Sequence, residues 1–284
     1  MTTNDSIEIF KSLLQKAVRR GNIEMVSHAV RFLTQHDLPW LRNRLAVLTF
    51  EECWTYGEEV SFENSPEIVS QQTLKLATAI KNRNAAGLGS LAFYLNAGDT
   101  SIFEGTRVDD DLKVVADGFK NPGAYWNGLA GQNLTKQQNI IVSNARNGFD
   151  MAVFPWDKCF MLAAGYLAIS AEIPSTTFSK PSTQEFPLWI AIDKHTPVGH
   201  SAICTAARRI GFDEEKAQWL VFYMEGAKCN QIVDSPWWER EVDWRLRQLE
   251  LTTSEAEKLW LELRPVLIDE LKYFTEELRI LIGK

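Results

Sequence analysis

The sequence predicts an all-α protein of several packed helices. Apolar residues recur every three or four positions along most of the 284-residue chain, which is the spacing of one buried face on a helix. No segment alternates apolar and polar residues long enough to indicate a strand. Ser65–Pro66 and Thr196–Pro197 each join a capping residue to a first-turn proline, as helix starts do. The 45% hydrophobic share is enough for one large core or two packed subdomains.

The N-terminal part of the chain predicts a series of helices with short loops between them. Gly21 ends the first of them as a left-handed cap would. The predicted helices cover residues 6–20, 22–36, 39–54, 65–83 and 85–96. Six glycines among Asp and Asn residues between 97 and 131 then predict a long irregular insertion.

The C-terminal part of the chain returns to the helical pattern. The predicted helices cover residues 135–147, 155–170, 197–210, 213–227, 236–250 and 254–282. Pro265 kinks or interrupts the last of these, and the Ser-, Thr- and Pro-rich residues 173–187 predict an exposed loop or hinge. We therefore expect an N-terminal helical subdomain over 1–96, an irregular insertion over 97–134 and a C-terminal helical subdomain over 135–284, or one continuous domain.

Composition excludes several function classes. The net charge of −7 provides no uniform basic field for holding a nucleic acid or an anionic membrane. No Walker-type phosphate loop, dinucleotide fingerprint, zinc-protease, nucleophile-elbow or EF-hand motif occurs. The four cysteines lack a CxxC pair, so they predict buried thiols and no metal. We expect a cytoplasmic protein without a cofactor and without a membrane segment.

The densest polar group of the sequence lies just before a predicted helix. Asp193, His195 and His200 fall within eight residues, together with Thr196 and Pro197. These side chains could supply a general base with an orienting carboxylate, or two metal ligands. The alternative is a structural role, in which Thr196 caps the helix and Asp193 or His195 hydrogen-bonds a neighbouring element. The sequence favours the structural role.

Basic residues cluster near the N-terminus. Seven stand against two acidic residues between positions 11 and 48. This excess indicates either a solvated face that complements a helix end or a contact to phosphates or an acidic partner. The candidate binding residues are Lys16, Arg19, Arg20, Arg42 and Arg44.

Three of the ten tryptophans, Trp237, Trp238 and Trp244, lie in one predicted helix. Tryptophan is favoured as a buried anchor at interfaces, so the group indicates helix packing or a subunit interface. Acidic residues between the rings argue against stacking on nucleic-acid bases.

One N-terminal pattern is similar to a known family. Residues 14–22 read LQKAVRRGN, and after a second helix residues 38–47 read LPWLRNRLAV. Over residues 8–58 the chain resembles the C-terminal helical, collar-like region of the replication-associated recombination AAA+ ATPases, relatives of clamp loaders. Residues 193–199 and 225–228 resemble segments of stand-alone phage and plasmid relatives of that region. The family's acidic pair and glycine are replaced here by Phe50-Glu51-Glu52-Cys53-Trp54, and its ATPase module is missing.

The resemblance implies an all-α collar-like module that assembles oligomers and docks on replication-fork proteins. We therefore expect a non-enzymatic adaptor of DNA replication or recombination, from a mobile element, that binds replication or recombination proteins, touches DNA through the basic residues, and forms a homo-oligomer. The alternatives are an all-α metal-dependent hydrolase or transferase using Asp193, His195 and His200, and a phage-type inhibitor of a host factor. A shared site is expected where the N-terminal helices meet the segment around His195.

Overall fold

The prediction of an all-α protein is confirmed. The computed structural model describes residues 3–63, 65–170 and 172–284, and these residues form fourteen α-helices and no β-strand. Three isolated β-bridges join extended residues within this described part of the chain. No helix in the same residues is both long and apolar enough to cross a membrane.

The chain forms two compact units, each built from segments distant in the sequence. Unit 1 contains residues 1–38, 180–230 and 245–284, and unit 2 contains residues 39–179 and 231–244. The boundaries expected from the sequence, at 96 and 134, both fall inside unit 2. The N-terminal hairpin therefore packs with the C-terminal helices, an arrangement that no local pattern indicates.

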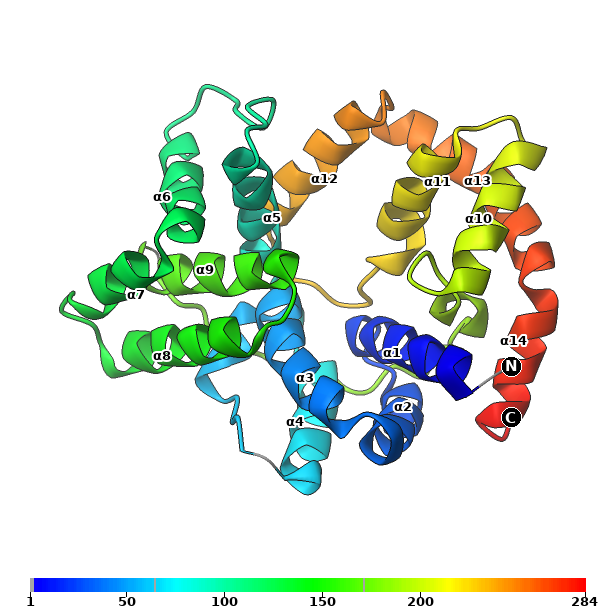
Figure 1. The fold of residues 1–284 in the computed structure, drawn as a ribbon, viewed down its shortest axis with the longest axis horizontal. Helices are drawn as coiled ribbons and strands as arrows, with labels where there is room; N and C mark the ends of the chain where they lie inside the picture. The colour runs from blue at the N-terminus through cyan, green and yellow to red at the C-terminus, as the bar shows by residue number, and fades with distance from the viewer. Residues whose placement is uncertain (1–2, 64, 171) are drawn as a thin grey trace. The chain divides into compact units, whose positions relative to one another are not determined.

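Unit 1 consists of antiparallel helix pairs that pack against a short buried turn. Figure 1 shows α1 beside α2, and α10 beside α11 and α13. The helices are α1 (Thr3–Arg19), α2 (Ile23–His36), α10 (Pro197–Arg209), α11 (Glu214–Val221), α13 (Thr253–Glu270) and α14 (Lys272–Leu281). A 3-10 turn over Leu188–Ala191 and a π-helical turn over Phe222–Gly226 complete the unit.

Unit 2 packs its helices around a core rich in alanine and aromatic side chains. Its central helix is α9, which is buried on nearly every side and contacts α5 and α8. The helices are α3 (Leu38–Glu52), α4 (Pro66–Thr78), α5 (Asn84–Asn96), α6 (Asp109–Lys120), α7 (Pro122–Ala130), α8 (Lys136–Met151) and α9 (Pro155–Ser170). The chain leaves this unit within α12 (Pro236–Gln248).

Helix starts follow the capping residues expected from the sequence. The Ser65 hydroxyl accepts a hydrogen bond from the Ile68 amide, and Pro66 lies in the first turn of α4. Gly21 has a φ of 61°, so it provides the left-handed conformation expected after α1. Such caps satisfy amide groups that the helix itself leaves without partners.

The irregular insertion predicted over 97–131 is wrong, because most of this stretch is helical. Helix α6 buries an apolar stripe, Leu112, Val115 and Ala116, and has three acidic residues in its first turn. Helix α7 begins at Pro122 behind the capping side chain of Asn121. These helix signals outweigh the tendency of the glycines to form loops. One of the glycines, Gly118, permits close packing on Tyr125.

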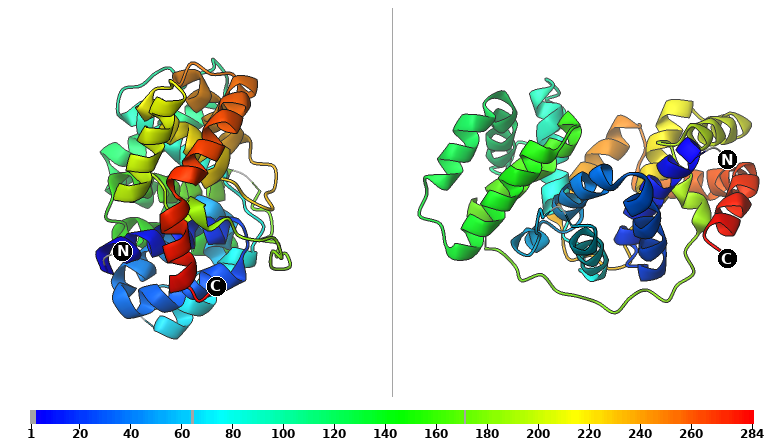
Figure 2. Two further views of the ribbon diagram at one scale, coloured as in Figure 1. Left: turned by 90° about the vertical axis from the view of Figure 1, so that its right-hand side faces the viewer. Right: turned by 60° about the horizontal axis from the view of Figure 1, so that its bottom comes forward.

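Two further boundaries differ from the prediction. Pro265 lies inside α13 without ending it, and the break falls at Leu271 instead. Helix α4 ends at Thr78, five residues earlier than predicted. By contrast, residues 172–187 contain no helix, and Figure 2 shows this stretch as an extended link, in agreement with the prediction.

Candidate functional site

Residues 16–20, 193–199 and 225–228 meet inside unit 1. The Lys16 ammonium forms an ion pair with the Asp193 carboxylate. Arg20 Nη2 donates to Glu225 Oε1 at 2.7 Å and to the Glu225 carbonyl at 2.9 Å. Arg19 Nη1 donates to the Gly226 carbonyl at 3.0 Å. The C-terminal end of α1 and the adjoining Arg20 are therefore bonded to both other segments.

This arrangement corrects the interpretation of the N-terminal basic residues as an exposed patch. Lys16, Arg19 and Arg20 are only 2%, 3% and 5% exposed. Their charges face a carboxylate or a carbonyl inside the protein, because a buried cation needs a compensating partner. They do not form a solvated face, and they do not reach out to the phosphates of a nucleic acid.

The two remaining basic candidates belong to unit 2. Arg44 donates to Glu51 Oε2 at 3.1 Å and to Asp157 Oδ1 at 3.0 Å, so it joins α3 to α9. The half-buried Arg42 side chain donates to the Asn43 amide oxygen. The Arg44 guanidinium is thus held by two carboxylates within unit 2. The five basic candidates divide between the two units.

The segment Asp193–His200 follows the structural interpretation. Asp193 Oδ1 accepts the His195 amide at 3.0 Å, and the Thr196 hydroxyl caps α10 by accepting the Gly199 amide at 3.0 Å. The His200 ring lies 3.2 Å from the Gln218 amide nitrogen. In the part of the chain that the structure describes, no three His, Cys, Asp or Glu side chains are grouped as metal ligands.

The environment of Asp193 favours its charged form. Burial by itself raises the pKa of this carboxyl, but the charges of Lys16 and His195 and the hydrogen bond from Lys16 outweigh burial, so the pKa of Asp193 is lowered. Because the folded state holds the proton more weakly than the unfolded state, this carboxylate stabilises the fold above its ordinary pKa of about 3.9. That stabilisation is lost as the pH falls through the lowered value.

A pH series tests this linkage. We expect Asp193→Asn to reduce the dependence of the unfolding free energy on pH below about pH 4, by up to about 1.4 kcal/mol per pH unit. Asparagine keeps an oxygen for the His195 amide but does not titrate. Urea unfolding at successive pH values measures the slope. An unchanged slope would show that Asp193 has an ordinary pKa in the folded protein.

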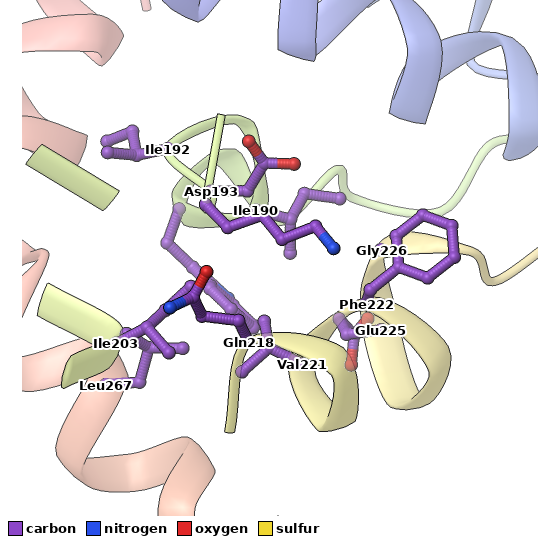
Figure 3. A pocket seen from close by; sticks show the side chains of 12 residues that line it. Ile190, Ile192, Asp193, Ile203, Gln218, Val221, Phe222, Glu225, Gly226 and Leu267 are labelled. Atoms are coloured by element: carbon purple, nitrogen blue, oxygen red, sulfur yellow. The ribbon is translucent and has the colours of Figure 1, made fainter. Parts of the chain in front are cut away.

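A π-helical turn positions the acidic partner of Arg20. Helix α11 widens into this turn at Phe222–Gly226, which places Glu225 and Gly226 opposite the end of α1. Such wide turns occur often at functional sites. Figure 3 shows Asp193 and Ile190 on one side of an interior cavity and Gln218, Val221 and Glu225 on the other. Its volume of about 20 Å³ is enough for about one water molecule.

A larger cavity is lined by both members of the ion pair between Arg20 and Glu225. Its volume is about 380 Å³, within the range of small-molecule sites. We call it the Arg20 pocket. It is lined by Arg20, Asn22, Ser182, Gln184, Glu185, Phe186, Pro187, Glu225, Lys228, Asn230, Trp260, Leu261 and Arg264.

The sequence indicated this pocket only in part. Arg20 was among the predicted binding residues, and Lys228 closes the segment 225–228 that the resemblance singled out. Arg264 and Trp260 come from α13, for which the sequence indicated no binding role. The pocket brings residues from both ends of the chain together, so periodicity alone does not reveal it.

The three tryptophans proposed as an interface pack within unit 2. Trp244 is 1% exposed, and its indole nitrogen donates to the Ser101 hydroxyl. The Arg83 guanidinium lies 3.5 Å from the centre of the Trp238 ring, and Arg240 lies 5.3 Å from that of Trp237. These contacts follow the helix-packing interpretation, and Trp244 has no surface left for another subunit.

Comparisons with known proteins found no match. No protein-family model, no curated protein and no solved structure matches the chain.

Proposed function

We propose that this chain is a non-enzymatic adaptor protein of DNA replication or recombination, in which unit 1 is the binding module. The observation that supports the proposal is the pair of buried ion pairs at the end of α1, Lys16 with Asp193 and Arg20 with Glu225. Lys16 and Arg20 fix the segments 193–199 and 225–228 to the N-terminal hairpin, so these two segments and the hairpin form one scaffold. A rigid scaffold held by buried ion pairs suits attachment to a partner.

Asp193 supports the adaptor over the hydrolase alternative. A general base needs a carboxylate that is open to substrate. One oxygen of Asp193 is paired with Lys16, and the other accepts the His195 amide. The residue is 8% exposed. This geometry favours a positioning role for Asp193.

The DNA contact is reassigned to two exposed cations at the Arg20 pocket. Lys228 and Arg264 are both exposed, and neither forms an ion pair within residues 3–63, 65–170 and 172–284. Exposed, unneutralised cations release counterions from nucleic acid and so provide salt-dependent affinity. In the adaptor we propose, Lys228 and Arg264 replace the buried lysine and arginines of α1 as the phosphate contacts.

DNA binding measured against salt tests the proposal. We expect the wild-type protein to bind single-stranded and forked DNA in fluorescence anisotropy. We expect Lys228→Glu with Arg264→Glu to weaken binding at least about tenfold and to reduce the slope of log K against log salt by about 1.5, since each lost phosphate contact contributes about 0.7 to 0.9.

The matched control is Lys136→Glu with Arg146→Glu. Both residues are exposed on α8 in unit 2, and the change in net charge is the same. An equal loss of binding in the control would show that only net charge matters. A wild-type protein that binds none of these DNAs at low salt would overturn the DNA contact.

A further inference from the structure

The Arg20 pocket combines cationic, acidic, amide and aromatic side chains in one cavity. Three cations line it, Arg20, Lys228 and Arg264, against two carboxylates, Glu185 and Glu225. The excess of one positive charge favours an anion. Of the two carboxylates, Glu225 is engaged with Arg20 at 2.7 Å.

Arg20, which lines this cavity, keeps one buried guanidinium nitrogen without a partner. Arg20 is 5% exposed, and its Nη1 atom has no hydrogen-bond partner among the described residues, whereas Nη2 donates twice to Glu225. A buried guanidinium nitrogen without a partner is costly, and an anionic ligand oxygen would satisfy it. Arginine is well suited to phosphate because its donors are planar and forked.

The remaining lining residues indicate more than an isolated anion. The Asn230 amide nitrogen already donates to the Arg20 carbonyl and the Ser182 hydroxyl, which leaves its oxygen as an acceptor. Glu185 is an exposed acceptor, and the largely buried Phe186 and Trp260 side chains contribute a small aromatic surface. Trp260 is held against Trp189, with ring centres 6.2 Å apart. A ligand that fits this set carries an anionic group, hydroxyl or amino donors for the carboxylate, and a flat apolar ring.

We propose that the Arg20 pocket binds a nucleoside monophosphate unit, free or as the phosphorylated end of a strand. The phosphate matches the three cations, the sugar and base donors match Glu185 and the Asn230 oxygen, and the base matches the aromatic surface. The volume of about 380 Å³ is much larger than a phosphate ion needs. An acidic peptide fits less well, because its acidic side chains offer no flat ring to the aromatic surface.

This inference deepens the proposed function, because it names the ligand chemistry of the same unit. Isothermal titration calorimetry with AMP, adenosine and inorganic phosphate tests it. We expect AMP to bind at least about tenfold more tightly than adenosine or phosphate, since it alone satisfies both the cations and the aromatic surface. Equal binding of phosphate and AMP would overturn the nucleotide assignment, as would tighter binding of a polyglutamate peptide.

Variants locate the ligand in the pocket. We expect Lys228→Gln with Arg264→Gln to weaken AMP binding at least about tenfold, because each removes a charge-assisted contact. Lys258→Gln with Lys272→Gln, at exposed positions of α13 and α14 outside the pocket, removes the same two charges; as the matched control, it leaves binding unchanged. The bulky Gln184→Trp change should also block AMP without changing any charge. AMP binding that survives all pocket variants would overturn the inference.

The outcomes separate this inference from the proposed function. If a 5′-phosphorylated oligonucleotide binds more tightly than its 5′-hydroxyl form, the site takes a strand end. If the two oligonucleotides bind equally and AMP still binds, the site takes the free nucleotide. DNA binding without AMP binding overturns the nucleotide pocket and leaves the adaptor. AMP binding without DNA binding overturns the DNA contact of the adaptor and leaves the nucleotide pocket.

Discussion

Replacing Lys16 with methionine is expected to lower the free energy of unfolding by about 3–5 kcal/mol, because it leaves the Asp193 carboxylate buried without its cation. Asp193 is 8% exposed and Lys16 is 2% exposed, so water does not reach either group easily. Lys16 also donates to the Ser12 hydroxyl at 2.8 Å, a contact that the variant loses. Urea unfolding followed by circular dichroism at pH 7 measures the change.

The double variant Lys16→Met with Asp193→Leu is the control that separates charge from packing. Replacement of both charges by apolar side chains of similar size is often close to neutral in other proteins. We expect this variant to regain most of the lost stability, except for about 1 kcal/mol from the hydrogen bond with the His195 amide. A double variant as unstable as Lys16→Met alone would show that the ion pair is not the reason for the loss.

Spacing in the sequence indicates the burial of Lys16 and Arg20. Lys16 follows Leu13 by three positions on the apolar stripe of α1, and Arg20, directly after the helix, follows Ala17 by three. A buried cation requires a compensating partner, such as a carboxylate or a carbonyl. The partner of Lys16 is 177 positions away in the sequence, and no local pattern identifies it. Counting charges along the chain therefore predicted an exposed patch.

Local signals predicted the helices well because each helix start depends on a few neighbouring residues. The Thr196 cap and the ends of α9 at residues 155 and 170 are examples. The division into two units depends instead on contacts between distant segments. The Arg20 pocket likewise needs residues near positions 20, 184, 228 and 264 to lie together. Without related sequences that vary together, such pairings are hidden in a single chain.

Glycine shows why composition misled the prediction over residues 97–131. A glycine inside a helix costs about 1 kcal/mol relative to alanine, so a run of them indicates loops. In unit 2 several glycines instead allow helices to approach closely. Gly87 and Gly89 on α5 face the backbone of Trp237 and of Cys159. These close approaches give both glycines a structural role.

We expect Gly87→Ala to destabilise the protein by about 3 kcal/mol or more, because overpacking of this kind forces the backbone to shift. A Cβ atom at position 87 would lie 2.1 Å from the carbonyl carbon and oxygen of Trp237. Backbone atoms cannot rotate away as a side chain does, so the start of α12 must move from α5. Thermal unfolding, followed by tryptophan fluorescence, measures the loss.

The matched control for Gly87→Ala is Gly128→Ala in α7. Nothing lies within 4 Å of a Cβ atom at that position, and the residue is inside a helix. The same chemical change there should raise stability by up to about 1 kcal/mol, since alanine has the higher helix propensity. The two variants therefore differ in sign for one reason, the distance between α5 and α12. Similar stabilities in the two variants would contradict the close packing of these helices.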